Sequence, residues 1–196
     1  MKILITGGTG YIGSHTCIEL LNNGYEVVIY DNLSNSSIKV LDRIKSITGT
    51  EPIFIYGDIR NEELMSRSMD GCASVIHFAG LKAVGESSQI PIEYYDNNIN
   101  GTLCLLRAMK KNNIFNLVFS SSATVYGDPQ YLPLDEKHPL SATNPYGKTK
   151  LFIEEILRDV YASNKNWHIA LLRYFNPIGA HSSGLIGESP NGIPNI

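Results

Sequence analysis

The sequence has few of the features that mark secreted, disulfide-bonded or membrane-bound proteins. Its 196 residues include three cysteines, Cys17, Cys72 and Cys104, which are widely spaced and form no CxxC pair. An odd number of separated cysteines argues against a disulfide framework and favours buried thiols in a reducing compartment. Apolar runs fall short of the roughly eighteen residues of a membrane span, and the run Ile3–Ile5 is too short for a signal peptide. We therefore expect a cytoplasmic protein.

Net charge and metal-ligand patterns are also sparse. The formal net charge is −3, the pI is near 5.9, and no basic cluster is present. This balance argues against nucleic acid or an anionic membrane as a partner. The five histidines are His15, His77, His138, His168 and His181. Their spacing matches no metal-ligand motif. Ser122 lacks the flanking glycines of a G-x-S-x-G nucleophile, so the sequence predicts neither a metal site nor that kind of hydrolase.

Short apolar runs alternate with helix-like stretches along most of the chain. The runs that predict strands are Lys2–Thr6, Glu26–Tyr30, Pro52–Tyr56, Ser74–Phe78, Leu117–Ser120 and His168–Arg173. The stretches that predict helices are Tyr11–Asn22, Ser36–Thr48, Glu62–Met69, Ile92–Met109 and Pro145–Asn164. This alternation predicts an α/β fold with a doubly wound parallel sheet of the Rossmann type, in which ligands bind at the carboxyl ends of the strands. We assign residues 1–175 to this domain and residues 176–196, rich in Gly, Pro, Ser and Asn, to the start of a substrate-binding region.

A glycine-rich loop follows the first predicted strand. Gly7 permits a tight turn, Gly10 lets backbone approach a pyrophosphate, and Gly13 permits close helix packing. The helix that follows offers free N–H groups and a positive dipole end to phosphates. Asp31 ends the next strand, where a carboxylate can bind an adenosine ribose and repel a 2′-phosphate. The sequence therefore predicts a dinucleotide site that favours NAD over NADP.

Other strand ends carry polar groups with more than one interpretation. Asp58 follows the third strand, where it could meet an adenine amino group or cap a helix that begins near Asn61. Gly80 brings bare backbone to the edge of the sheet, and Lys82 and Asn97 are plausible polar contacts nearby. The segment Ser120–Thr124 could bind a cofactor or the reacting oxygen, or could be a loop of turn-forming serines.

Tyr146 and Lys150 form a Tyr-x-x-x-Lys pair near the start of a predicted helix. Residues four apart lie on one face of a helix, so the phenol and the ammonium are neighbours. A nearby cation favours the phenolate and lowers the pKa of a tyrosine from its usual value near 10. The pair is therefore a candidate general base for redox chemistry on an alcohol.

Together these features resemble the extended short-chain dehydrogenase/reductase family, and within it the UDP-glucose 4-epimerase family. The shared motifs are Gly7-x-x-Gly10-x-x-Gly13, the strand-end serine and Tyr146-x-x-x-Lys150. The most similar segments are Thr6–His15, His77–Glu86, Glu93–Thr102, Ser120–Gly127 and Leu171–Gly179, with the runs HFAGLKAVGES and YYDNNINGTL.

The resemblance implies a set of site residues. NAD would be bound by Gly7, Gly10, Tyr11, Ile12, Gly13, Asp31, Asn32, Leu33, Ser34, Asn35, Ser36, Asp58, Ile59, Phe78, Ala79, Gly80, Leu81, Lys82, Asn97, Ser120, Tyr146, Lys150, Tyr174 and Phe175. The sugar nucleotide, UDP-glucose or UDP-galactose, would be bound by Lys82, Ser122, Tyr146, Asn176 and Asn195. The catalytic residues would be Tyr146, Lys150 and Ser122, in a transient oxidation at C4 that belongs to galactose metabolism.

The resemblance also carries expectations about the whole molecule. Members of the family are longer, so we expect this chain to be an N-terminal portion that epimerises poorly by itself. A homodimer through the two long predicted helices is implied, whereas acceptance of N-acetylated sugars stays open. One alternative is a nucleotide-sugar 4,6-dehydratase, but Ala123 and Thr124 stand where that chemistry needs an acidic pair. The other alternative is a non-catalytic NAD-binding module.

Overall fold

Six parallel strands form a single sheet in the computed structural model, which describes residues 1–189. The strands are β1 (Lys2–Thr6), β2 (Glu26–Asp31), β3 (Ile53–Tyr56), β4 (Cys72–His77), β5 (Asn116–Ser122) and β6 (His168–Tyr174). Their order across the sheet is β3-β2-β1-β4-β5-β6, so the order reverses between β1 and β4. Both of these strands end beside the glycine-rich loop, which places the predicted ligand site at the point of reversal.

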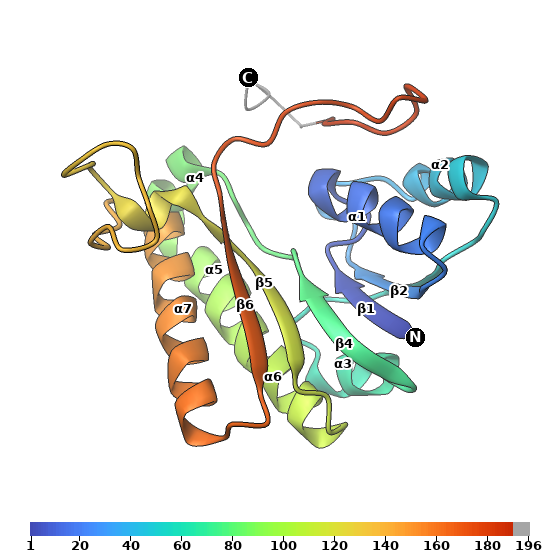
Figure 1. The fold of residues 1–196 in the computed structure, drawn as a ribbon, viewed down its shortest axis with the longest axis horizontal. Coiled ribbons are helices and arrows are strands. Elements are labelled where there is room, and N and C mark those ends of the chain that lie inside the picture. Colours follow the sequence, from blue (N-terminus) through green and yellow to red (C-terminus); the bar gives the residue numbers. More distant parts are fainter. Residues whose placement is uncertain (190–196) are drawn as a thin grey trace.

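Helices cover both faces of the sheet, as the alternating pattern predicts (Figure 1). The helices are α1 (Tyr11–Asn22), α2 (Lys39–Thr48), α3 (Glu62–Ser68), α4 (Val84–Gln89), α5 (Pro91–Tyr95), α6 (Gly101–Lys111) and α7 (Pro145–Ser163). Helices α1 and α2 lie on one face, and α3, α6 and α7 lie on the other. This arrangement confirms the doubly wound Rossmann-type fold.

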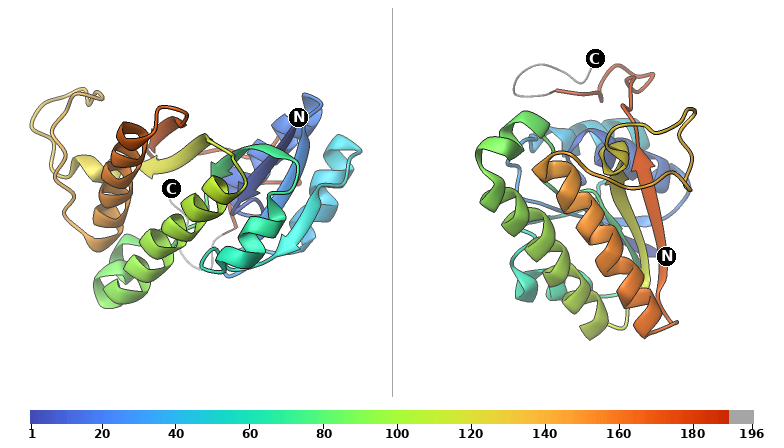
Figure 2. Two further views of the ribbon diagram at one scale, coloured as in Figure 1. Left: turned by 90° about the horizontal axis from the view of Figure 1, so that it is seen from below. Right: turned by 90° about the vertical axis from the view of Figure 1, so that its left-hand side faces the viewer.

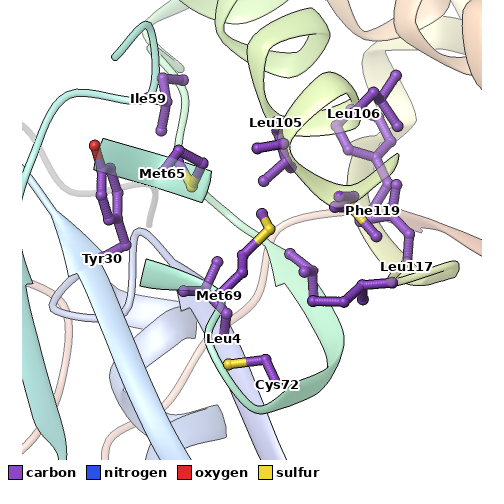
Figure 3. Packing of buried hydrophobic residues seen from close by; sticks show 14 of the residues in the cluster. Leu4, Tyr30, Ile59, Met65, Met69, Cys72, Leu105, Leu106, Leu117 and Phe119 are labelled. Carbon is purple, nitrogen blue, oxygen red and sulfur yellow. The ribbon is translucent and has the colours of Figure 1, made fainter. Parts of the chain in front are cut away.

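Each face of the sheet has its own hydrophobic core. Alternate residues of β1 point to opposite faces, so Ile3 and Ile5 pack with α1 whereas Leu4 packs with α3 and α6. Figure 3 shows the second of these cores, where Tyr30 and Phe119 are fully enclosed among methionine and leucine side chains. The two cores fix the positions of the strand ends that carry the polar residues.

The long helix predicted at Ile92–Met109 differs from the observed structure. It consists of α5, a π-helical turn at Asp96–Asn100 and α6, and a separate short helix, α4, precedes it. The apolar spacing of the segment is nearly continuous, so the wider turn cannot be recognised from the sequence pattern. A π-turn adds a residue to one turn of a helix and is often found at functional sites.

The segment after β6 crosses the carboxyl edge of the sheet toward α1 and α2 (Figure 1). Tyr11 donates its hydroxyl hydrogen bond to the carbonyl of Gly179 over 2.6 Å, and Ile186 is buried against the core beneath α1. The C-terminal part of the described chain therefore lies over the glycine-rich loop. Among residues 1–189, no helix is long and apolar enough to cross a membrane.

Candidate active site

The glycine-rich loop has the close contacts that its three glycines predict. Gly7 has a positive φ of 71°, and a methyl group on it would lie 2.7 Å from the backbone nitrogen of Ala79. A methyl group on Gly13 would overlap the carbonyl oxygen of Gly7. At Gly10, the N-cap residue of α1, the nearest atom to such a group is Gly7 O at 3.3 Å, so the backbone there stays accessible. Two glycines thus serve packing, and Gly10 leaves room for a ligand at the helix N-terminus.

Asp31 is buried at the end of β2 and faces the glycine-rich loop. Its carboxylate accepts hydrogen bonds from the backbone nitrogen of Thr9 at 3.1 Å and from that of Leu33 at 2.9 Å. Ser36 is tied to the same place, because its hydroxyl lies 2.7 Å from that of Thr9. This use of Ser36 is why α2 begins at Lys39 and not at Ser36 as predicted. The carboxylate is held by two backbone donors and retains lone pairs for a further ligand.

Asp58 does not cap a helix, so that alternative is wrong. The N-cap of α3 is Asn61, whose side chain accepts from Leu64 N at 3.1 Å. The Asp58 carboxylate is instead held by Arg60, with its Oδ2 2.7 Å from a guanidinium nitrogen, and this partner lowers the pKa of Asp58. Arg60 also binds Asp96 over 2.7 Å and so links the end of β3 to the π-turn.

The loop after β4 is held by a residue that the sequence analysis did not identify. Asn98, in the π-turn, accepts a hydrogen bond from Leu81 N at 2.8 Å and donates one to Leu81 O at 3.0 Å. It also bonds to Thr149 of α7 at 3.0 Å and accepts from Asn97 at 2.9 Å. The buried asparagine thus connects the loop of Gly80 to the helix of Lys150, and a methyl group on Gly80 would lie 3.8 Å from Lys150 Nζ.

Tyr146 and Lys150 lie on the first turns of α7, on the face turned toward the end of β5. Lys150 is buried and donates a hydrogen bond to the carbonyl of Ser120 at 2.7 Å. Its ammonium is 4.9 Å from the centre of the Phe119 ring and 6.0 Å from that of the Tyr146 ring. The helix therefore brings the pair together with the strand-end serines, as the sequence predicts.

The pKa values of the pair differ from the simple expectation of a phenolate stabilised by a neighbouring cation. Burial raises the pKa of Tyr146, and hydrogen bonding with Ser122 opposes that rise. Burial lowers the pKa of Lys150 to about 8. The expected lowering of the tyrosine pKa is therefore not present in the protein alone, because desolvation disfavours the charged form of each residue.

The remaining predicted residues lie either in the loops after β2, β3 and β4 or at the end of β6. Ile59 and Phe78 pack their side chains into the cores, so these positions offer a ligand mainly their backbone. Leu33 adopts a positive φ of 58° in the loop after β2, where the side chain of Asn32 accepts from Ser34 N at 3.1 Å. The residues at the end of β6 have different surroundings.

Tyr174 pairs with Ser122 across β5 and β6, and burial raises its pKa. Phe175 is exposed and stacks on Tyr126 with ring centroids 6.4 Å apart. Asn176 follows and is exposed, whereas Asn195 lies outside the described residues. Lys82 forms an ion pair with Glu188 at 3.4 Å, which joins the loop after β4 to the crossing C-terminal segment.

Sequence reasoning also missed a buried charged group behind the site. Glu154 of α7 is fully buried and binds Arg173 of β6 through two hydrogen bonds, at 3.0 and 2.7 Å. Ser121 of β5 donates to the same carboxylate at 2.6 Å. The local sequence gives no signal for this network, because its three members lie far apart in the chain.

Comparisons with known proteins agree with this geometry. The model of the NAD dependent epimerase/dehydratase family matches residues 3–191. UDP-glucose 4-epimerase of Bacillus subtilis is 58% identical over 197 residues, which are 100% of this chain and 58% of that protein. The enzyme of the same name from Dictyostelium discoideum is 59% identical over 99% of this chain and 57% of its own length.

Solved structures give the same result. The UDP-glucose 4-epimerase of Bifidobacterium longum in complex with NAD+ and UDP superposes with a TM-score of 0.96 at 56% identity, covering 99% of this chain and 59% of that one. The chain thus spans about 58% of the length of the curated relatives that it matches. It belongs to the NAD dependent epimerase/dehydratase family.

Proposed function

We propose that the protein carrying this chain interconverts UDP-galactose and UDP-glucose at C4 of the hexose, using tightly bound NAD. The observation that carries the proposal is the placement of Tyr146 and Lys150 beside the serines at the end of β5 and beside Gly80. Relatives that are 58% identical over the whole chain bear the name of this activity. These relatives are longer than this chain, so we propose the activity for the protein that carries the chain.

The residues present fit a dinucleotide. The open approach at Gly10 and the N-terminus of α1 suit a pyrophosphate, and the carboxylate of Asp31 suits the adenosine ribose. Asp58 would meet the adenine, and Asn97, Tyr174 and Phe175 would lie around the nicotinamide. When bound, NAD supplies an oxidised ring that takes hydride from C4 and returns it.

The chain's own residues would handle the proton of the 4-hydroxyl. Tyr146 would accept it as general base and later return it as general acid. Lys150 would exchange the carbonyl of Ser120 for the nicotinamide ribose and keep its positive charge near the phenol. Burial alone raises the pKa of Tyr146, so the phenol requires positive charge nearby to ionise at neutral pH. Lys150 and the oxidised nicotinamide ring would supply that charge. Ser122, which is close enough to the phenol to oppose the rise in its pKa, would orient the sugar hydroxyl.

Inversion at C4 requires the 4-keto sugar to present its other face to the cofactor. Lys82 and Asn176 would bind the sugar nucleotide at the carboxyl edge, and we propose Asn195 for the same role. We also propose that residues 1–175 form the NAD-binding domain and that residues 176–196 begin the substrate-binding region. The 196-residue chain spans only part of its relatives' length, so we expect it to convert UDP-galactose much more slowly than the Bacillus subtilis enzyme.

Epimerisation is favoured over the related dehydratase reaction. Elimination of water needs an acid and a base beyond the tyrosine, and the positions after Ser122 hold Ala123 and Thr124. The Thr124 hydroxyl is bonded to Ser122 at 2.9 Å, so it supports the serine and supplies no carboxylate. A cytoplasmic role in galactose metabolism completes the proposal.

Substitution of Tyr146 tests the proposed function. Tyr146→Phe removes the acid–base group and keeps the ring, so NAD should still bind. We expect UDP-galactose-dependent reduction of bound NAD to fall by about 10²- to 10⁴-fold, the usual contribution of a general base. Absorbance of the reduced cofactor measures it. A variant that reduced NAD at the parental rate would remove Tyr146 from the mechanism and favour the non-catalytic alternative.

A further inference from the structure

Glu154 is a fully buried carboxylate that the proposed chemistry does not use. It lies on α7 one turn after Lys150 and has three partners on three elements. Arg173 of β6 binds both of its oxygens, Ser121 of β5 donates to Oε1, and Arg158 of α7 approaches Oε2 at 3.2 Å. These partners lower the pKa of Glu154 against the effect of burial, so it is ionised at neutral pH.

The buried ion pair of Glu154 and Arg173 is expected to contribute little net stability. Removing both charges from water costs about as much free energy as their attraction returns, and apolar replacements are often as stable. The pair is directional, however, because a guanidinium binds a carboxylate through two parallel hydrogen bonds. Arg173 is fixed at its other end as well, with its guanidinium carbon 4.9 Å from the Tyr126 ring centre and a 3.2 Å bond to the Tyr126 hydroxyl.

The carboxylate is one of three side chains of α7 that face the end of β5. Tyr146, Lys150 and Glu154 are four residues apart and therefore lie on one face of the helix. Lys150 and Glu154 bond to the carbonyl of Ser120 and to the hydroxyl of Ser121, and Ser122 is close enough to Tyr146 to oppose the rise in its pKa. Two of three successive residues of β5 are thus held by hydrogen bonds from α7, and the third lies near Tyr146. The right-hand view of Figure 2 shows α7, in orange, packed alongside β5 and β6.

We propose that Glu154 and Arg173 are positioning residues for the tyrosine base. Their ion pair fixes α7 along its axis against β5 and β6, and so sets where Tyr146 and Lys150 stand relative to Ser122 and Ser120. This inference rests on the proposed function of Tyr146. It assigns the pair no contact with substrate or cofactor, and it predicts that loosening the pair shifts the ionisation of a phenol two helical turns away.

The groups that face the Tyr146 phenol are Lys150 on the same helix, Ser122 on β5 and Tyr94 on α5. Lys150 favours a phenolate by its charge, and the nearby Ser122 opposes the rise in the pKa of Tyr146. Both contacts depend on the axial position of α7. A shift of the helix should therefore weaken them together and raise the apparent pKa of the phenol, whereas a purely structural pair would leave it unchanged.

Three variants and one control separate these possibilities in the NAD-loaded protein. Glu154→Gln and Ser121→Ala each remove part of the network, the second by deleting a single hydroxyl. The double variant Glu154→Leu with Arg173→Met replaces the ion pair by apolar groups and should keep its thermal stability. Arg158→Gln is the control, since Arg158 touches the same carboxylate but is half exposed and has its other ion pair with Glu155 of the same helix.

Two readouts are needed. The first is the pH dependence of NAD reduction by UDP-galactose. The second is the ionisation of Tyr146 without cofactor, measured by ultraviolet difference absorption with a matching Tyr146→Phe variant subtracted. We expect the double variant to unfold at the parental temperature but to show both midpoints about one pH unit higher, with about tenfold slower reduction at neutral pH. Ser121→Ala should shift in the same direction, and Arg158→Gln should match the parent.

A double variant or Ser121→Ala with parental midpoints in both readouts would overturn the proposal. Should the double variant fail to fold, Ser121→Ala and Glu154→Gln decide in its place. The proposed function fails separately, if the parental protein shows no reduction of NAD by UDP-galactose. The phenol titration needs neither cofactor nor sugar, so it still measures positioning in that case.

Discussion

Gly10, the N-cap of α1, and Gly13, in its first turn, restrict a side chain for different reasons. A methyl group on Gly13 would overlap the carbonyl of Gly7, which is backbone and cannot move aside cheaply. A methyl group on Gly10 would lie 3.3 Å from that same oxygen, a tight contact with room to relax. Gly13 is therefore required by the fold, and Gly10 is the one that we assign to a ligand approaching the helix.

Alanine substitutions should separate these two roles. We expect Gly13→Ala to lower the free energy of unfolding by about 1–3 kcal/mol through overpacking, and Gly10→Ala to cost less than half of that. NAD affinity should nevertheless fall by at least about tenfold in Gly10→Ala. Urea unfolding and titration with NAD measure the two effects. Gly85→Ala, with nothing within 4 Å, is the neutral control; parental NAD affinity in Gly10→Ala would contradict the assigned role.

His77 is fully enclosed between two threonines at the end of β4. The Thr102 hydroxyl donates to Asn98 O, so it must accept from His77 Nε2 at 3.0 Å. In the neutral imidazole that the lowered pKa favours, Nδ1 then accepts from the hydroxyl of Thr6 at 2.6 Å. Burial and the positive charge of Lys150 lower the pKa of His77 to about 3. This network ties β1 and β4 to the π-turn without placing a charge behind the site.

The lowered pKa predicts a dependence of stability on pH. The unfolded chain binds a proton on His77 below about pH 6.5 whereas the folded protein does not, so this contribution is complete above about pH 6.5 and is lost as the pH falls toward 3. Between about pH 6.5 and 3, each unit by which the pH falls should lower the free energy of unfolding by about 1.4 kcal/mol through His77. Urea unfolding of the parent and of His77→Gln between about pH 7.5 and 5 measures the difference. Equal slopes for the two proteins would contradict it.

At the scale of elements, two asparagine caps make a matched pair. Asn144 caps α7 through Gly147 N at 2.8 Å, and Asn61 caps α3 through Leu64 N at 3.1 Å. The bonds are alike, but only α7 carries Tyr146 in its first turn. The two caps should therefore contribute similarly to the free energy of unfolding, but only the Asn144 cap should affect the position of Tyr146.

We expect Asn144→Ala and Asn61→Ala each to reduce the free energy of unfolding by about 1 kcal/mol. Asn144→Ala should also slow NAD reduction several-fold, because fraying of the first turn displaces the base. Denaturant unfolding and single-turnover reduction measure the two quantities side by side. Equal effects of both variants on reduction would show that the start of α7 does not position the tyrosine.

The elements were predictable to different degrees. Helix α1 runs from Tyr11 to Asn22 as predicted, since a glycine-rich turn and a run of helix-forming residues define it locally. The π-turn at Asp96–Asn100 was not predicted, because Asn98 selects it through bonds to Leu81 and Thr149, which lie on other elements. Local pattern defines the helix, and contacts between elements define its irregularity.

At the scale of the whole molecule, α5 and α7 present apolar side chains on one surface. Ile92 is 78% exposed, and Phe152, 46% exposed, stacks with Tyr95 at 6.3 Å between ring centroids. Figure 2 shows the two helical segments side by side. We propose this surface, defined by Ile92, Tyr95 and Phe152, as the contact of a homodimer, in line with the pairing that the family resemblance implies.

Ile92→Lys should weaken such a dimer. Loss of one buried aliphatic side chain costs about 1.5–3 kcal/mol, or about ten- to hundredfold in Kd. Sedimentation equilibrium of the parent and the variant measures it. The control is Ile53→Lys on the edge strand β3, where the isoleucine is 50% exposed and lies away from the proposed contact. Equal association of the two variants would contradict the assigned surface.

The sequence by itself determined the alternation of strands and helices, the glycine-rich loop, Asp31 at the end of β2 and the spacing of Tyr146 and Lys150. Each depends on residues that are close in the chain, through periodicity, turn geometry or helix pitch. Only the tertiary structure decided that Glu154 meets Ser121 and Arg173, that Asn98 holds Leu81, and that burial raises the pKa of Tyr146. Those properties depend on packing and desolvation between distant segments, which no local pattern encodes.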